Sequence, residues 1–132
     1  MELPIFQADA FASRLFGGNP AAVVLLPQWL PDATLQAIAA ENNLAETAFV
    51  IPLQGEFGLR WFTPEVEVDL CGHATLASAH ILFQHGYATP PSVVFRYQGG
   101  TLTVTQQGDL LALCFPSRPP QPAQCDAAVI AA

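Results

Sequence analysis

The chain has 132 residues, with eleven Asp and Glu against four Arg and no Lys, and its formal net charge at pH 7 is −7. Such an acidic chain lacks the basic patch that nucleic acids and anionic membrane surfaces require, so we expect neither as a partner. The absence of lysine excludes Schiff-base chemistry, including pyridoxal phosphate held through a lysine.

Hydrophobic residues make up 52% of the chain and charged residues only 11%, whereas a soluble domain carries about 25% charged residues. This shortfall predicts apolar surface that a partner domain or a second subunit covers. The length suits one domain, and no apolar run reaches the roughly 20 residues that span a bilayer. Three cysteines without a secretory signal favour reduced thiols and a cytoplasmic location.

Short apolar or alternating stretches, separated by Gly, Pro and Asn turns, predict a chain rich in strands. In chain order we expect strands over 3–11, 21–26, 47–51, 57–63, 66–70, 92–97, 101–105 and 110–115. A first helix is predicted over 31–41, where a proline and an acidic residue begin the segment. Its apolar face consists of Leu35, Ile38 and Ala39.

The second predicted helix, over 74–84 with its ends at about 73 and 85, contains no Asp, Glu, Lys or Arg. A surface helix would show a charged stripe, so this helix is expected at the centre of the domain, with Gly86 just past its end. The sequence therefore predicts an α+β fold in which a mainly antiparallel sheet wraps around a central apolar helix.

The proline-rich stretch after residue 116 is typical of a linker. Asp126 is a plausible N-cap, and the apolar residues after it predict a helix that stops without a capping signal. We therefore expect an N-terminal domain over 1–116, a linker over 117–125 and, over 126–132, the truncated start of a second domain.

The segment Cys71-Gly72-His73 marks the start of the central helix. A helix start has unpaired backbone N–H groups and a partial positive charge, which suit an anion such as a substrate carboxylate. Gly72 leaves the backbone open to a ligand, and Ala74 continues this first turn, so we expect both to contact substrate. His73 is a candidate donor or proton relay, and the alternative is a polar side chain that the backbone satisfies.

Cys71 has two opposite interpretations. At a helix N-terminus the pKa of a thiol falls, which favours a thiolate that contacts substrate or serves a thiol-based racemase. The alternative is a buried, unreactive cysteine. Cys114 is flanked by apolar strand residues and is expected to be structural, and Cys125 lies in the predicted linker.

Glu46 stands between apolar residues at the entry to a predicted strand. Burial raises the pKa of a carboxylate, which suits general acid–base catalysis, and the alternative is a solvated loop residue. Glu41, on the preceding helix, is expected to be a surface charge.

No metal site is expected, because His73, His80 and His85 do not share a helix face and no C-x-x-C pair occurs. His80 is expected on a mostly buried helix, and His85 near its C-terminal end, where a positive charge is favoured. Asn19, in the turn over 16–20, can donate its amide to a ligand carboxylate or simply form the turn.

Five segments follow one another across most of residues 5–80. They are Asp9-Ala-Phe11, Phe16-Gly-Gly-Asn-Pro-Ala-Ala-Val-Val24, Ala39-Ala-Glu-Asn-Asn-Leu-Ala-Glu-Thr-Ala-Phe49, Arg60-Trp-Phe-Thr-Pro64 and Val66-Glu-Val-Asp-Leu-Cys-Gly-His-Ala-Thr75. In this order and spacing they resemble the PhzF family of phenazine biosynthesis, which belongs to the diaminopimelate-epimerase-like superfamily.

The resemblance implies two similar domains with an active site in the cleft between them, and isomerase or epimerase chemistry by proton transfer without a cofactor. By motif position, Glu46 is similar to the general acid–base of the family, and Asn19 to a cleft residue. His73 and Gly72 resemble its substrate-binding and relay elements. Cys71 stands where related amino-acid epimerases carry a thiol base, but the resemblance favours the carboxylate as the proton carrier.

Three functions follow as hypotheses. The first is the N-terminal half of a cofactor-independent PhzF-like isomerase that moves a proton between carbons of a small carboxylated metabolite. This half would be inactive alone, would lack its C-terminal domain, and would be a possible homodimer. The second is a non-catalytic fragment or half-domain that binds a ligand or self-associates. The third is a thiol-based racemase that uses Cys71.

Overall fold

The computed structural model describes residues 5–10, 19–69, 71–108, 110–115 and 124–129. Its elements, in chain order, are β1 (Ile5–Ala10), β2 (Asn19–Leu25), α1 (Asp32–Asn42), β3 (Glu46–Leu53), β4 (Glu56–Phe62), β5 (Glu67–Val68), α2 (Gly72–Gln84), β6 (Ser92–Tyr97), β7 (Gly100–Gln107), β8 (Leu110–Phe115) and β9 (Gln124–Val129). Within these residues, neither helix is long and apolar enough to cross a membrane.

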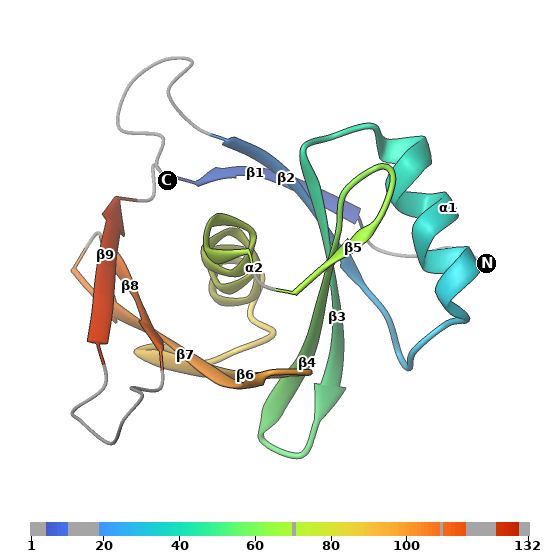
Figure 1. The fold of residues 1–132 in the computed structure, drawn as a ribbon. Helices are drawn as coiled ribbons and strands as arrows, with labels where there is room; N and C mark the ends of the chain where they lie inside the picture. The colour runs from blue at the N-terminus through green and yellow to red at the C-terminus, as the bar shows by residue number, and fades with distance from the viewer. Residues whose placement is uncertain (1–4, 11–18, 70, 109, 116–123, 130–132) are drawn as a thin grey trace.

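The strands form one sheet in the order β1-β2-β3-β4-β6-β7-β8-β9, with β5 paired to β4 outside this path. Neighbours run antiparallel except for β2 with β3 and β4 with β6. Each parallel pair is separated along the chain by a helix, because a parallel connection needs a crossover. Figure 1 shows the sheet curled around α2, with α1 outside it. The predicted sheet around a central apolar helix is therefore confirmed.

The side chains of β3 alternate between two apolar cores. Ala48 and Val50 belong to the inner core around α2, whereas Phe49 and Ile51 belong to the outer core beneath α1. Because both faces of the strand are covered here, residues 48–51 form an unbroken apolar run. The strand that begins with Glu46 is therefore packed on both faces.

Helix α2 is the centre of the inner core. Eight of its residues are buried, and among these Thr75 and Ser78 are polar. The helix ends as predicted: Gly86 has a φ of 78°, a left-handed conformation that glycine adopts without a steric penalty. The apolar face expected for α1 is also confirmed, with Leu35 and Ala39 buried and Ile38 packed against them.

The helix expected from Asp126 is wrong, because this segment forms β9. The strand pairs antiparallel with β8, and Asp126 lies opposite Leu113. The edge of β8 offers backbone hydrogen bonds to an added strand. The sheet thus extends beyond residue 116. Residues 117–123 and 130–132 lie outside the described part, and the division of the chain into two domains stays a prediction.

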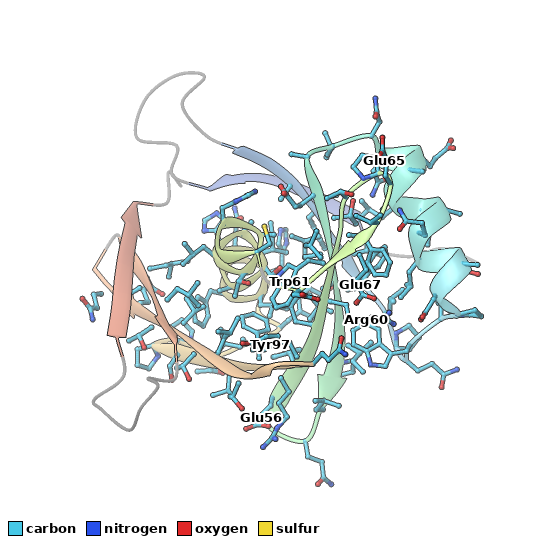
Figure 2. All side chains as sticks on the ribbon, in the orientation of Figure 1. Glu56, Arg60, Trp61, Glu65, Glu67 and Tyr97 are labelled. Carbon is cyan, nitrogen blue, oxygen red and sulfur yellow. The ribbon has the colours of Figure 1, made fainter. Side chains whose placement is uncertain are left out.

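Arg60 on β4 joins three elements on the outer side of the sheet. Its Nε and Nη2 donate to the Glu67 carboxylate of β5 at 2.8 and 2.7 Å, and Nη1 donates to Asp32 of α1 at 3.0 Å. The guanidinium carbon lies 5.5 Å from the Trp29 ring and 5.3 Å from the Phe62 ring, within cation–π range. Figure 2 shows Arg60 and Glu67 side by side. This arrangement holds β5, the strand that leads into Cys71.

Arg60→Lys is expected to lower the free energy of unfolding by about 1–2 kcal/mol, because an ammonium group cannot reproduce the two parallel bonds to Glu67 or the stacking. The midpoint of urea unfolding of the intact protein measures the effect. The matched control is Arg96→Lys, since Arg96 pairs with Glu56 but its side chain is 60% exposed. Equal midpoints for the two variants would contradict the role of Arg60 as a junction.

Candidate active site

Glu46 and His73 lie in direct contact, although 27 residues separate them along the chain. Glu46 opens β3, and His73 is in the first turn of α2. The distance from His73 Nε2 to Glu46 Oε2 is 2.7 Å, the length of a short hydrogen bond. Each side chain is 19% exposed. The two candidate catalytic residues therefore form a pair that is mostly sheltered but still open to solvent.

The start of α2 brings His73 to this position. Cys71 is extended, with φ −143° and ψ 104°, and the helix begins at Gly72. The backbone of His73 and Ala74 hydrogen-bonds the Cys71 sulfur, so we consider the N–H of Gly72 as the first-turn donor for a ligand beside the Glu46–His73 pair. A Cβ at Gly72 would meet Leu113 at 3.5 Å, an ordinary contact. Packing alone thus does not require glycine here.

Cys71 is a free thiol beside the His73 ring, with Sγ 3.6 Å from Nδ1 and 3.7 Å from Nε2. Burial raises the pKa of this thiol to about 11, and the negative charge of Glu46 adds to the effect. The expectation of a lowered pKa at the helix start is therefore wrong. Hydrogen bonds from the backbone of Ala74 and His73 lower the pKa, but burial outweighs them.

Asn19 begins β2 at the same end of the sheet as Glu46. Ala21, two residues further on, pairs with Glu46 across the parallel β2–β3 ladder. The backbone of Asn19 is thus close to the candidate site in register, and its side chain lies outside the described part. Ala74 is fully buried, and its backbone hydrogen-bonds the Cys71 sulfur, so the structure does not leave this residue open to a ligand.

A sequence profile of the phenazine biosynthesis-like protein family, PhzC-PhzF, matches residues 8–127. The chain belongs to this family. The resemblance drawn from its five segments is therefore confirmed.

Several PhzF-like relatives are close in sequence. The chain is 57% identical over 122 residues to an uncharacterized isomerase of Pseudomonas aeruginosa. The matched region covers 92% of this chain and 47% of that protein. It is 50% identical over 130 residues to phenazine biosynthesis-like domain-containing protein 2 of Mus musculus, covering 92% and 45%.

Solved structures agree with this assignment. A PhzF-family phenazine biosynthesis protein from Enterococcus faecalis is 47% identical and superposes with a TM-score of 0.83 over 92% of this chain and 49% of its own. A predicted epimerase of Pseudomonas aeruginosa gives a TM-score of 0.69 at 26% identity, over 86% of this chain and 43% of its own. The chain thus spans about half the length of the relatives that it matches.

The other titratable candidates are not part of the Glu46–His73 pair. Glu41 is exposed on α1, as expected. His80 is half-buried on α2, and burial together with the charge of His85 lowers its pKa. The ring of His85 stacks against Phe6 of β1, with centroids 4.4 Å apart. Within the described residues, none of the three hydrogen-bonds Glu46 or His73.

The sequence analysis did not identify two buried residues that hydrogen-bond near the site. Thr75 and Trp61 are joined by a buried hydrogen bond, and Thr75 also bonds the backbone of Cys71. A polar residue in a mostly apolar helix could have indicated a buried hydrogen bond at Thr75. The spacing of residues does not show that its partner is Trp61, 14 residues earlier.

One cluster in the described residues has the donor set for a metal ion. Single ligand atoms of Glu46, Cys71 and His73 lie within 4.8 Å of one another, and sulfur, nitrogen and oxygen donors together suit zinc. However, the Glu46–His73 hydrogen bond engages two of these atoms, and a thiol of pKa about 11 would first have to lose its proton. The geometry therefore favours acid–base chemistry at this cluster.

Proposed function

We propose that this chain carries the proton-transfer side of a PhzF-like isomerase site, in which Glu46 moves a proton between two carbons of a small carboxylated substrate. The observation that carries the proposal is the 2.7 Å contact between Glu46 and His73 at the start of α2. A carboxylate and an imidazole in contact at a helix start support acid–base chemistry. The names of relatives as isomerases support the same reaction class.

In the proposed reaction, the Glu46 carboxylate removes a proton from one substrate carbon. The C–H bond breaks, an O–H bond forms on Glu46, and the electron pair left on carbon delocalises into the adjacent unsaturated group. The protonated Glu46 then returns the proton to a second carbon, so that a double bond shifts and no electrons are gained or lost. This reaction needs no redox cofactor, and we propose that none takes part.

His73 assists Glu46 through its Nε2–H. The hydrogen bond orients the carboxylate before proton removal. The backbone N–H group of Gly72, at the positive end of the helix dipole, would hold the substrate carboxylate. Asn19, at the start of the neighbouring strand, is proposed as a further contact to substrate.

The remaining surface of the site is proposed to come from outside this chain. The relatives are about twice as long, so a C-terminal domain would face Glu46 and His73 across a cleft. A homodimer and a cytoplasmic location are proposed with it, because the low charged fraction implies covered surface and the composition favours reduced thiols.

Deuterium incorporation tests the proposal. The intact protein would be incubated in D₂O with a panel of small carboxylic acids that carry an acidic C–H next to a double bond, and the products followed by ¹H NMR. Exchange or migration of a carbon-bound proton in at least one acid is expected. No exchange above the uncatalysed rate across a panel that includes acids bound by the protein would contradict it.

The position of Cys71 beside His73 makes a thiol-based racemase the second candidate. Because its pKa is about 11, only roughly one thiol in 10³ is ionised at pH 8. Cys71→Ser is therefore expected to keep turnover within about fivefold, and alkylation of the wild-type thiol should be slow at pH 8 and accelerate as the pH rises towards 11. Fast alkylation at pH 7 with full loss of turnover in Cys71→Ser would favour the racemase.

A further inference from the structure

The hydroxyl of Thr75 is fully buried and has two partners. It accepts a hydrogen bond from Trp61 Nε1 at 3.0 Å and donates to the backbone carbonyl of Cys71 at 2.8 Å. Trp61 lies on β4, and Cys71 is the residue that precedes α2. Thr75 thus connects the first turn of the central helix to the sheet through a single oxygen atom.

The tryptophan is itself held in place. Its ring packs edge-on against Tyr97 of β6, with centroids 5.2 Å apart, and only 2% of the residue is exposed. Figure 2 shows Trp61 and Tyr97 together beside α2. On β4, Trp61 pairs with Ala48 of β3, two residues after Glu46. The indole is therefore fixed relative to the strand that begins with Glu46.

These contacts connect the two members of the candidate pair. Glu46 belongs to β3, β3 pairs with β4 at Trp61, Trp61 bonds Thr75, and Thr75 bonds Cys71 two residues before His73. The pair itself is sensitive to small shifts. Each helical residue adds 1.5 Å of rise, so a slip of about one residue would break a 2.7 Å hydrogen bond.

We propose that Thr75 and Trp61 are positioning residues that set the distance between His73 and Glu46. The catalytic meaning of that distance rests on the proposed function, but the distance itself can be measured without turnover. A misplacement of about 1 Å near reacting groups can cost on the order of 10²-fold in rate. Loss of the Trp61–Thr75 bond should thus reduce turnover without removing any group that touches substrate.

Ser78 provides the matched control. It lies one turn further along the same buried helix, is also fully buried, and donates to the Ala74 carbonyl at 2.8 Å. That bond stays within the helix, and among the described residues it is the single hydrogen bond of this hydroxyl. Ser78→Ala therefore removes a comparable buried hydrogen bond without loosening the contact between helix and sheet.

The experiment uses the intact protein with Thr75→Val, Thr75→Ser, Trp61→Phe and Ser78→Ala. The first readout is the side-chain Nε2–H resonance of His73 in a ¹⁵N-resolved NMR spectrum, which reports its hydrogen bond to Glu46. This resonance should persist in wild type, Thr75→Ser and Ser78→Ala, and shift upfield or vanish in Thr75→Val and Trp61→Phe. The second readout is deuterium incorporation into whichever acid the wild type exchanges. In Thr75→Val and Trp61→Phe, kcat for this reaction should fall roughly 10- to 100-fold, while KM stays within about twofold of the wild-type value.

The outcomes separate positioning from stability. If the His73 resonance and kcat of Thr75→Val match those of Ser78→Ala at a temperature where both are folded, the proposal is overturned. Should Thr75→Val fail to fold, Trp61→Phe decides by the same criteria. A failure of the proposed function would appear separately, as exchange that persists in Glu46→Gln, while the His73 resonance still tests the positioning.

Discussion

Glu46→Gln is expected to lower kcat for deuterium incorporation by roughly 10²–10⁴, the contribution usual for general acid–base catalysis. Glutamine has nearly the same shape as glutamate, and its amide oxygen can still accept the hydrogen bond from His73. It cannot, however, take up and return a proton. KM is therefore expected to stay within about twofold, since the groups that bind substrate are unchanged. Initial rates of exchange over a range of acid concentrations measure both constants.

Glu41→Gln is the matched control for this result. It removes the same charge from an exposed position on α1, five residues earlier in the chain. Its kcat should equal that of wild type. If Glu46→Gln retained full turnover in a folded protein, another group would have to carry the proton, and the assignment of Glu46 would be wrong.

His73→Leu is expected to lower kcat/KM by roughly 10²–10³, the usual cost of removing one preorganised donor from an active site. The change removes the Nε2–H that bonds Glu46 at 2.7 Å and leaves the carboxylate mostly buried without this partner. His73→Gln should recover part of the loss, because a glutamine amide can donate to the same carboxylate. Exchange kinetics of both variants provide the comparison.

The control for the histidine is His85→Gln, since His85 stacks on Phe6 outside the candidate site. Its kcat/KM should match that of wild type. An equal loss in His85→Gln and His73→Leu would point to a general effect on folding. A loss of less than about fivefold in His73→Leu would exclude His73 from the catalytic pair.

Much of the architecture could be predicted from local patterns. The stretch that became α2 lacks any charged residue, and the structure buries eight of its residues at the centre of the sheet. The strand over 92–97 was predicted with the bounds that the structure has. In both segments the side chains themselves report their surroundings, because apolar residues at helical or strand spacing are stable only where they can be buried.

Other features depend on contacts between distant parts of the chain. The segment from Asp126 has a short helical pattern, but the free edge of β8 turns it into a strand. The parallel pairing of β2 with β3 and of β4 with β6 likewise follows from where the helices cross the sheet. Strand pairing cannot be predicted from a local segment, because the partner strand lies elsewhere in the chain and is brought beside it by folding.

The family, the central helix and the residue types of the site could be predicted from the sequence, since they depend on ordered motifs and local hydrophobic spacing. The contact between Glu46 and His73 across 27 residues, and the hydrogen bond between Trp61 and Thr75, became visible only in the folded chain. Folding also reversed the expected pKa shift of Cys71, because burial by the surrounding core outweighs the helix start. Distances and desolvation are properties of the packed chain, so they could not be predicted from the order of residues alone.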